Sequence, residues 1–306
     1  MKYKGKEIIG AGLKGFSRKT FSWKIINVCN QRCSYCYEGY GSKDTIPNST
    51  FFKDNSQQNH YLNILTILKL KTIGTFEVDL IGGEPTLHPH LFNIIQDLTS
   101  NKNCYEISLI TNLSKPLSYF KRLDDLKSEK LIICPSLHFD YYSDELIQKC
   151  IDINNFEYID IVPIVMIHDD IKHHSNIMKT LKTFKENNVE FSISFLSSVH
   201  KYVVDYNADA IKDIEQFASD SSSKFTFNVE GLGNVKLNSH DVHENKLTKF
   251  KGWDCRPQRY IIEHNGGIVN ACTGKKMPFF GQCEKVTCPK SDCNCSVQWY
   301  YEKSKV

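Results

Sequence analysis

The residues most able to do chemistry are cysteines, of which the chain of 306 residues contains twelve. Three of them, Cys29, Cys33 and Cys36, lie within eight residues in the segment CNQRCSYCY. Thiolates hold iron–sulfur clusters, usually four for a cubane, so three ligands would leave one iron open to the amine and carboxylate of a small molecule. A structural zinc site is the alternative, but it closes with a fourth cysteine or histidine. The nearest such residue along the chain is His60.

A second chemical element, Gly82–Gly83–Glu84–Pro85, directly follows the apolar run FEVDLI. The two glycines let the backbone pass close to a ligand, and Glu84 supplies a carboxylate acceptor. A simple glycine-rich turn is the alternative interpretation.

The CxxxCxxC spacing, with Tyr35 before the third cysteine and the GGE sequence Gly82–Glu84 further on, resembles the signature of the radical S-adenosylmethionine (SAM) superfamily. The resemblance implies a [4Fe-4S] cluster on Cys29, Cys33 and Cys36 that binds SAM and cleaves it reductively to a 5′-deoxyadenosyl radical. That radical abstracts hydrogen from a substrate C–H. The electron would come from an external donor such as flavodoxin or ferredoxin.

The same resemblance implies a set of SAM-binding residues. The contacts at Gly82, Gly83 and Glu84 would receive the amino group of SAM, and Tyr35 would stand beside the pocket. Asn112 and Ser136 match polar positions at two further strand ends, although each could equally be a capping or turn residue. His138 in SLHFD is either a substrate-side group or a packed histidine.

The second cysteine set begins at Cys255 and continues through an expected hairpin to Cys272. The hairpin brings these two thiols together at its open end. The spacing resembles the twitch/SPASM-type domain of radical SAM enzymes, which implies one auxiliary iron–sulfur cluster here. Cys255 and Cys272 are the firmest ligands, and Cys283 is left outside the set. Two of three further cysteines complete the site: Cys288, Cys293 and Cys295. A structural zinc ribbon is the alternative.

The elements that must position these residues alternate between strands and helices, which favours βαβ units and a parallel sheet. We expect an α/β fold, a partial (β/α)6 TIM-like barrel whose site lies at the carboxyl ends of the strands. The expected strands are Phe21–Val28, Phe76–Ile81, Glu106–Ile110, Leu131–Ser136, Tyr158–Met166 and Glu190–Leu196. The expected helices are Asn59–Leu70, Leu91–Ser100, Leu117–Lys127, Ser143–Ile151 and Ile177–Asn187.

Three domains are expected along the chain. Residues 1–20 form an N-terminal extension, residues 21–207 the radical SAM core, and residues 208–306 a small cysteine-rich C-terminal domain containing the β-hairpin. Three cysteines of the core, Cys104, Cys134 and Cys150, are expected to be buried apolar fillers, although Cys134 or Cys283 could instead donate a hydrogen atom.

The net charge of +3 is mild and does not require nucleic acid or an anionic membrane as a partner. No segment has the apolar length of a membrane span, and the first fifteen residues lack the apolar core of a signal peptide. We therefore expect a cytoplasmic protein, where clustered thiols favour metal over disulfides.

The substrate is expected to be a small molecule, a carbohydrate or a peptide. The auxiliary cluster would assist its oxidation, cross-linking or epimerisation. About twenty residues precede Phe21, too few for a peptide-docking domain. The competing hypotheses are a non-catalytic, zinc-stabilised binding module and a radical SAM fold used only for electron transfer or regulation. The GGEP sequence after a strand and the near-neutral charge disfavour the binding module.

Overall fold

The computed structural model describes the chain in segments that fall into two compact units. One unit comprises Phe21–Ile214 and Ile262–Gly267, and the other comprises Met1–Thr20, Glu215–Ile261 and Ile268–Val306. The described residues are 1–12, 19–36, 38–39, 62–196, 204–206, 213–214, 217, 224–238, 241–242, 245–276, 285–289, 291, 293 and 301–305.

The larger unit is built on a sheet with neighbouring strands in the order β3, β4, β5, β6, β8 and β9, and β7 also pairs with β6. All pairs from β4 to β9 are parallel. The strands are β3 (Lys19–Ile26), β4 (Phe76–Gly82), β5 (Cys104–Thr111), β6 (Leu131–Leu137), β7 (Asp160–Ile161), β8 (Ile164–Ile167) and β9 (Ser192–Phe195).

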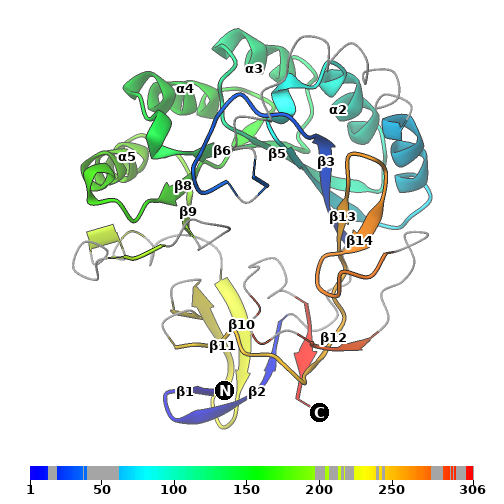
Figure 1. Ribbon diagram of the computed structural model, residues 1–306, viewed down its shortest axis with the longest axis vertical. Helices are drawn as coiled ribbons and strands as arrows, with labels where there is room; N and C mark the ends of the chain where they lie inside the picture. The colour runs from blue at the N-terminus through cyan, green and yellow to red at the C-terminus, as the bar shows by residue number, and fades with distance from the viewer. Residues whose placement is uncertain are drawn as a thin grey trace. The chain divides into compact units, whose positions relative to one another are not determined.

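Helices connect these strands and stand side by side along the outside of the sheet (Figure 1). They are α2 (Leu91–Thr99), α3 (Leu117–Asp124), α4 (Asp144–Asn154) and α5 (His174–Glu186), and residues 62–70 are also helical. The parallel α/β sheet is therefore confirmed, and its closure into a partial barrel stays a prediction.

Periodic burial of apolar side chains explains why these segments pack as they do. In β4 the residues Phe76, Val78 and Leu80 alternate with half-buried neighbours, as expected for a strand with two unequal faces. In α2 the buried side chains recur at helical spacing, which turns one face of the helix to the core; they are Leu91, Ile94, Ile95 and Leu98. Helix α4 begins after Ser143, whose side chain accepts from the backbone N–H of Leu146 at 3.1 Å.

The expected strand Tyr158–Met166 is wrong as a single element, because the structure divides it into β7 and β8. Pro163 lies between the two strands and has no backbone N–H to donate to a neighbouring strand. The N–H of Val162 still donates to the carbonyl of Ile133 at 2.9 Å, so the chain leaves the sheet only briefly.

The smaller unit contains an antiparallel sheet with strands in the order β11, β10, β2, β16, β12 and β15, and β1 also pairs with β2. Its bounds are β1 (Lys2–Tyr3), β2 (Lys6–Ala11), β10 (Lys224–Val229), β11 (Gly233–Asn238), β12 (Asp254–Cys255), β15 (Val286–Thr287) and β16 (Lys303–Ser304). Two further strands, β13 (Arg259–Ile262) and β14 (Ile268–Asn270), are neighbours and form the expected hairpin.

The N-terminal residues are part of this sheet rather than an extension apart from it. Strand β2 lies between β10 and β16, with Gly10 opposite Asn228 and Ala11 opposite Lys303. Ile8 is fully buried in a core that also contains Phe225. The sequence analysis missed this because the partners lie more than 200 residues away, and local patterns carry no information on such pairings.

None of the helices in the described part of the chain is long and apolar enough to cross a lipid bilayer.

Candidate active site

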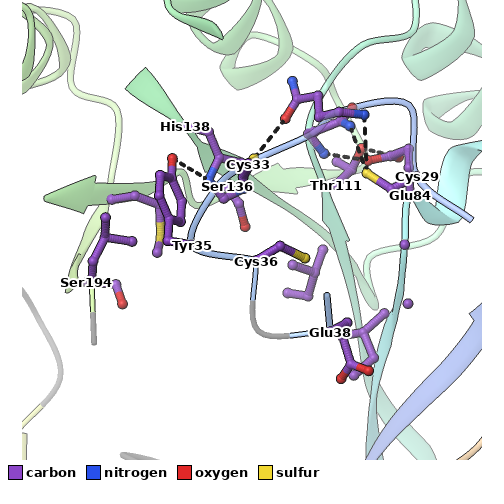
Figure 2. Close-up of a pocket in the computed structure, with 18 of the residues that line it drawn as sticks. Cys29, Cys33, Tyr35, Cys36, Glu38, Glu84, Thr111, Ser136, His138 and Ser194 are labelled. Atoms are coloured by element: carbon purple, nitrogen blue, oxygen red, sulfur yellow. Dashed lines mark hydrogen bonds between the residues drawn. The ribbon is translucent and has the colours of Figure 1, made fainter. Parts of the chain in front are cut away.

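A pocket of about 330 Å³ opens at the ends of the parallel strands of the larger unit (Figure 2). All three thiols of the first cysteine set line it, and so does every residue that the sequence analysis placed around SAM. The lining residues are Cys29, Gln31, Cys33, Tyr35, Cys36, Glu38, Ile81, Gly82, Gly83, Glu84, Ile110, Thr111, Asn112, Ser136, His138, Met166, Ser194, Phe195 and Leu196.

The cysteine loop follows β3, and its three cysteines line the same pocket. Cys33 is buried, while Cys29 and Cys36 are half-buried. Burial raises the pKa of the Cys33 thiol to about 12, and the neighbouring Cys36 and Cys29 add to the rise. The thiol is therefore neutral at neutral pH unless a metal takes the sulfur, because metal ligation requires the thiolate. The backbone N–H of Gln31 donates to Cys29 Sγ at 3.4 Å, so one sulfur already has a protein donor.

Gly82 and Gly83 lie so close to the backbone at and just after the end of β3 that a larger residue would clash with it. The N–H of Gly83 donates to the carbonyl of Ile26 at 3.0 Å, and the N–H of Glu84 donates to that of Val28 at 2.7 Å. A Cβ on Gly83 would lie 1.9 Å from the Val28 carbonyl oxygen. Gly82 has a φ of +142°, and a Cβ there would lie 2.0 Å from the Ile26 oxygen. The GGE segment is thus docked on the chain that leads into the cysteine loop.

Glu84 is fully buried, and its carboxylate binds protein donors on both sides. Oε1 accepts from the N–H of Thr86 at 3.0 Å, from the Thr86 hydroxyl at 2.5 Å and from the Thr111 hydroxyl at 2.7 Å. Oε2 accepts from the N–H of Asn112 at 2.6 Å. The carboxylate therefore ties the end of β4 to the end of β5, and its contact with the amino group of SAM stays a prediction.

Asn112 is held in place by its neighbours. Its Nδ2 donates to Asn30 Oδ1 at 2.7 Å, and its Oδ1 accepts from the N–H of Ser114 at 3.1 Å. Nδ2 also lies 3.9 Å from Cys29 Sγ. Ser136, at the end of β6, lines the pocket with a half-buried side chain. Both residues expected at these strand ends thus reach the same pocket as the cysteines.

Tyr35 and His138 form a polar pair on the pocket wall. Tyr35 Oη lies 3.2 Å from His138 Nδ1, as Figure 2 shows. Burial lowers the pKa of His138 to about 4, so the ring is neutral at neutral pH. The sequence left open whether His138 faces the substrate or is packed, and the structure places it in the pocket lining.

Four cysteines of the second set are buried in the smaller unit: Cys255, Cys272, Cys288 and Cys293. Burial, opposed by the nearby Lys303 ammonium and aided by the other three cysteines, raises the pKa of Cys255 to about 12. The backbone holds them, since the N–H of Cys288 donates to the carbonyl of Trp253 at 2.7 Å. Cys283 and Cys295 lie outside the described residues.

The predicted site residues did not include nine of the lining residues: Gln31, Glu38, Ile81, Ile110, Thr111, Met166, Ser194, Phe195 and Leu196. Met166 and Leu196 end two of the expected strands, so their position at a carboxyl strand end was the available signal. Of the remaining core cysteines, Cys104 and Cys150 are buried and Cys134 is half-buried.

Three kinds of known protein resemble this chain: a family model, curated relatives and solved structures. The model of the radical SAM superfamily matches residues 23–214. A GTP 3′,8-cyclase of Haemophilus ducreyi is 29% identical over 92 residues, which cover 29% of this chain and 24% of that protein. A GTP 3′,8-cyclase of Xanthomonas axonopodis pv. citri is 32% identical over 89 residues, covering 29% and 25%. The match thus spans about a quarter of the length of these relatives.

One solved structure, described as native anSMEcpe with bound AdoMet, superposes with a TM-score of 0.52 at 14% identity. The superposition covers 85% of this chain and 78% of that one. At this level of identity the likeness concerns the fold alone.

Proposed function

This chain belongs to the radical SAM superfamily, and from that premise we propose that it cleaves SAM reductively and uses the resulting 5′-deoxyadenosyl radical to abstract hydrogen from a substrate C–H. The observation that carries the proposal is the pocket itself. It gathers Cys29, Cys33 and Cys36 with the Gly82–Glu84 segment in about 330 Å³, a volume typical of small-ligand sites.

The donor set fits the cofactor that the family implies. Three thiols line the pocket, so a [4Fe-4S] cluster on Cys29, Cys33 and Cys36 keeps one iron without a protein thiolate. When bound, such a cluster supplies an electron and a chelation point for the amine and carboxylate of SAM.

The other predicted site residues that line the pocket are assigned proposed roles in SAM binding or in holding the strand ends. We assign Tyr35, Gly82, Gly83, Asn112 and Ser136 to the SAM side, because each lines the pocket beside the thiols. Glu84 acts mainly by fixing the strand ends, since its carboxylate already accepts four hydrogen bonds.

The pocket wall at the carboxyl ends of β8 and β9 carries apolar side chains that include Met166, Phe195 and Leu196. We assign this wall to the substrate side, where apolar groups would exclude water and stray hydrogen donors from a reactive radical.

In the smaller unit we propose one auxiliary iron–sulfur cluster. Cys255, Cys272, Cys288 and Cys293 would supply the four thiolates that a cubane needs, and all four are buried, free cysteines of the smaller unit. Zinc suits four thiols equally well as a donor set, so metal analysis must decide. About eight irons per chain support the proposal, and a Cys255→Ala variant should retain about half of them. Four irons with one zinc would contradict it.

The substrate class proposed from the sequence is a small molecule, a carbohydrate or a peptide. The GTP 3′,8-cyclases among the relatives make GTP the first small molecule to test. An external donor such as flavodoxin or ferredoxin would supply the electron.

The test is reductive cleavage of SAM by the anaerobically reconstituted full chain. With dithionite and SAM, liquid chromatography should detect 5′-deoxyadenosine and methionine, and the Cys33→Ala variant should give neither above background. No product above that control would refute the enzyme proposal and favour a non-catalytic, metal-stabilised module. Adding uniformly deuterated GTP then tests the substrate, because hydrogen abstraction from GTP would transfer deuterium into 5′-deoxyadenosine.

A further inference from the structure

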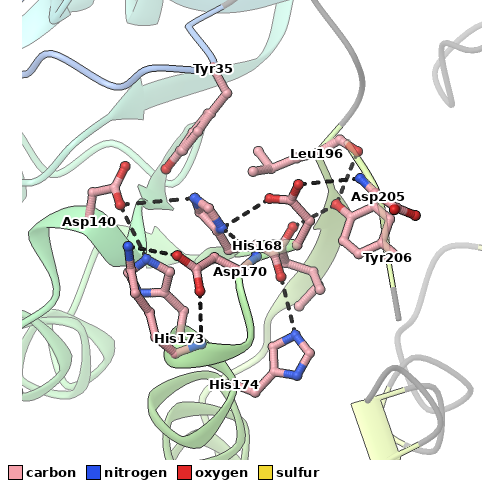
Figure 3. A network of polar contacts seen from close by, with 12 residues as sticks. Tyr35, Asp140, His168, Asp170, His173, His174, Leu196, Asp205 and Tyr206 are labelled. Carbon is pink, nitrogen blue, oxygen red and sulfur yellow. Dashed lines mark hydrogen bonds and ion pairs between the residues drawn. The ribbon is translucent and has the colours of Figure 1, made fainter. Parts of the chain in front are cut away.

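A second group of potential metal ligands lies in the larger unit beside the pocket (Figure 3). The side chains of Asp140, His168 and His173 bring one ligand atom each to within 4.8 Å of one another. Asp140 lies in the 3-10 turn Phe139–Tyr141 after β6, while His168 follows β8 and His173 ends the 3-10 turn Ile171–His173. Because β6 and β8 are paired in parallel, their following loops lie side by side and the three groups meet.

The spacing of these atoms fits a small cation. Asp140 Oδ1 lies 3.2 Å from His173 Nε2 and 3.9 Å from His168 Nε2. A tetrahedral ion with bonds of about 2.0–2.1 Å separates its ligand atoms by roughly 3.3–3.4 Å, which lies between the two observed distances. Two imidazole nitrogens and one carboxylate oxygen are donors that divalent first-row transition ions accept.

A buried nitrogen without a hydrogen bond independently favours a cation at this position. The His173 side chain is buried, with 7% of the residue exposed, and Nε2 makes no hydrogen bond. Its contact with Asp140 Oδ1 is close in distance but is not a hydrogen bond in geometry. Leaving a buried polar atom without a partner is costly, and such atoms usually have an explanation. A cation placed between Nε2 and Oδ1 would satisfy both.

Behind His168, a carboxylate and a backbone N–H both lie within hydrogen-bond distance of Nδ1. Its Nδ1 lies 3.1 Å from Asp169 Oδ1, and a carboxylate behind a ligating histidine fixes the ring and its tautomer. The N–H of Asp170 also reaches Nδ1, at 2.9 Å. An ion bound to Nε2 requires the tautomer of His168 that carries its hydrogen on Nδ1. In that tautomer Nδ1 donates to Asp169 Oδ1 and can no longer accept from the N–H of Asp170.

We propose that Asp140, His168 and His173 bind one divalent first-row transition ion, with zinc as the first candidate. Three protein ligands leave a fourth position for water or a ligand oxygen, and the Asp140 side chain, 31% exposed, marks the side open to solvent. The His168 ring packs edge-on against Tyr35 with ring centroids 5.3 Å apart. The ion would therefore rigidify the loop that supports one wall of the pocket. This proposal does not rest on SAM cleavage and stands or falls separately from it.

The test loads the tag-free, cluster-reconstituted full chain with Co²⁺ and counts cobalt per chain after desalting. Oxidised cubanes are diamagnetic, so the high-spin Co²⁺ signal can be read by electron paramagnetic resonance without interference. Wild type should retain one cobalt with nitrogen and oxygen ligation. Asp140→Asn and His173→Ala should weaken binding at least about 100-fold, more than the loss of a residue behind a ligand causes.

His174→Ala is the matched control, because His174 neighbours the site in sequence but its ring contacts the backbone carbonyl of His168, at 3.3 Å, rather than a proposed ligand atom. It should bind cobalt as wild type does, with unchanged iron. Asp140 is partly exposed, so Asp140→Asn tests the site even if His173→Ala fails to fold. Equal cobalt retention in wild type and Asp140→Asn, or no site-bound cobalt in wild type, would overturn the proposal.

Discussion

At the scale of single residues, Glu84 shows why the carboxylate, rather than any polar group, is needed at its position. All four of its hydrogen-bond partners are donors: two N–H groups and two hydroxyls. A backbone N–H can only donate, and one binds each oxygen: the N–H of Thr86 binds Oε1 and the N–H of Asn112 binds Oε2. The site therefore demands an acceptor at both oxygens.

The substitution Glu84→Gln tests this demand. The amide places an NH₂ donor against at least one protein donor, so we expect a loss of about 2–3 kcal/mol in the free energy of unfolding. SAM binding should weaken with it, because the ends of β4 and β5 are no longer tied. Urea denaturation and SAM titration measure the two effects. Asp97→Asn, on the exposed face of α2, is the control and should change neither. Wild-type stability in Glu84→Gln would contradict the role assigned to the carboxylate.

His138 gives the protein a pH dependence whose sign follows from its surroundings. Burial lowers the pKa from 6.5 to about 4 in the folded chain. Between these values the unfolded state binds more protons, so the contribution to stability is complete above pH 6.5 and is lost as the pH falls toward 4. When the pH is lowered from 7 to 5, the free energy of unfolding of wild type should fall by about 2 kcal/mol more than that of His138→Gln.

The measurement is the urea midpoint of both proteins at the two pH values. The other histidines are common to both, so their contributions cancel in the difference. If the urea midpoints of the two proteins fell equally between pH 7 and pH 5, His138 would not be held neutral by burial.

At the scale of elements, the cysteine loop is positioned by backbone rather than by side chains. The turn after β4 sits directly on the carbonyls of Ile26 and Val28, just before Cys29. The geometry of the thiols thus depends on how closely two main-chain segments can approach.

Gly83→Ala should therefore disturb the first cluster without touching a ligand. Its Cβ would meet the Val28 carbonyl and, at 2.7 Å, the Cys29 nitrogen, so the loop must shift at a cost of about 1–3 kcal/mol. We expect less iron in the first site and at least about tenfold slower SAM cleavage. Gly74→Ala is the matched control, since a Cβ there meets nothing within 4 Å. Equal iron content and rates in the two variants would contradict the close approach.

Local patterns in the sequence predict most of the elements that carry the pocket. Short apolar runs alternating with helical segments predicted the strands β4, β5 and β6, and the spacing of Cys29, Cys33 and Cys36 predicted residues that line the pocket. What the sequence could not provide are pairings between distant segments. Asp140 and His173 lie 33 positions apart in the sequence and meet only because β6 and β8 pair.

At the scale of the whole molecule, strands from the two ends of the chain pair in one sheet. Strand β2 lies in one sheet with β10 and β16, so the smaller unit cannot form its sheet from C-terminal residues alone. The same unit contains the four cysteines proposed to hold the auxiliary cluster. Residues near the N-terminus therefore support the unit in which the auxiliary cluster is proposed.

Adjacent isoleucines in β2 test this dependence. Ile8 is fully buried beside Phe225, whereas Ile9 is 44% exposed. Ile8→Ala should cost about 2–5 kcal/mol of unfolding free energy through the cavity it leaves, and Ile9→Ala should change it by less than about 0.5 kcal/mol. Trp253 lies in the same core as Ile8, so the unfolding of this unit contributes to the change in tryptophan fluorescence. If residues 1–20 were an extension apart from the sheet, the two variants would unfold at the same urea concentration. A lower midpoint for Ile8→Ala, accompanied by loss of auxiliary iron before loss of SAM cleavage, would show that the N-terminal strand stabilises the second metal site.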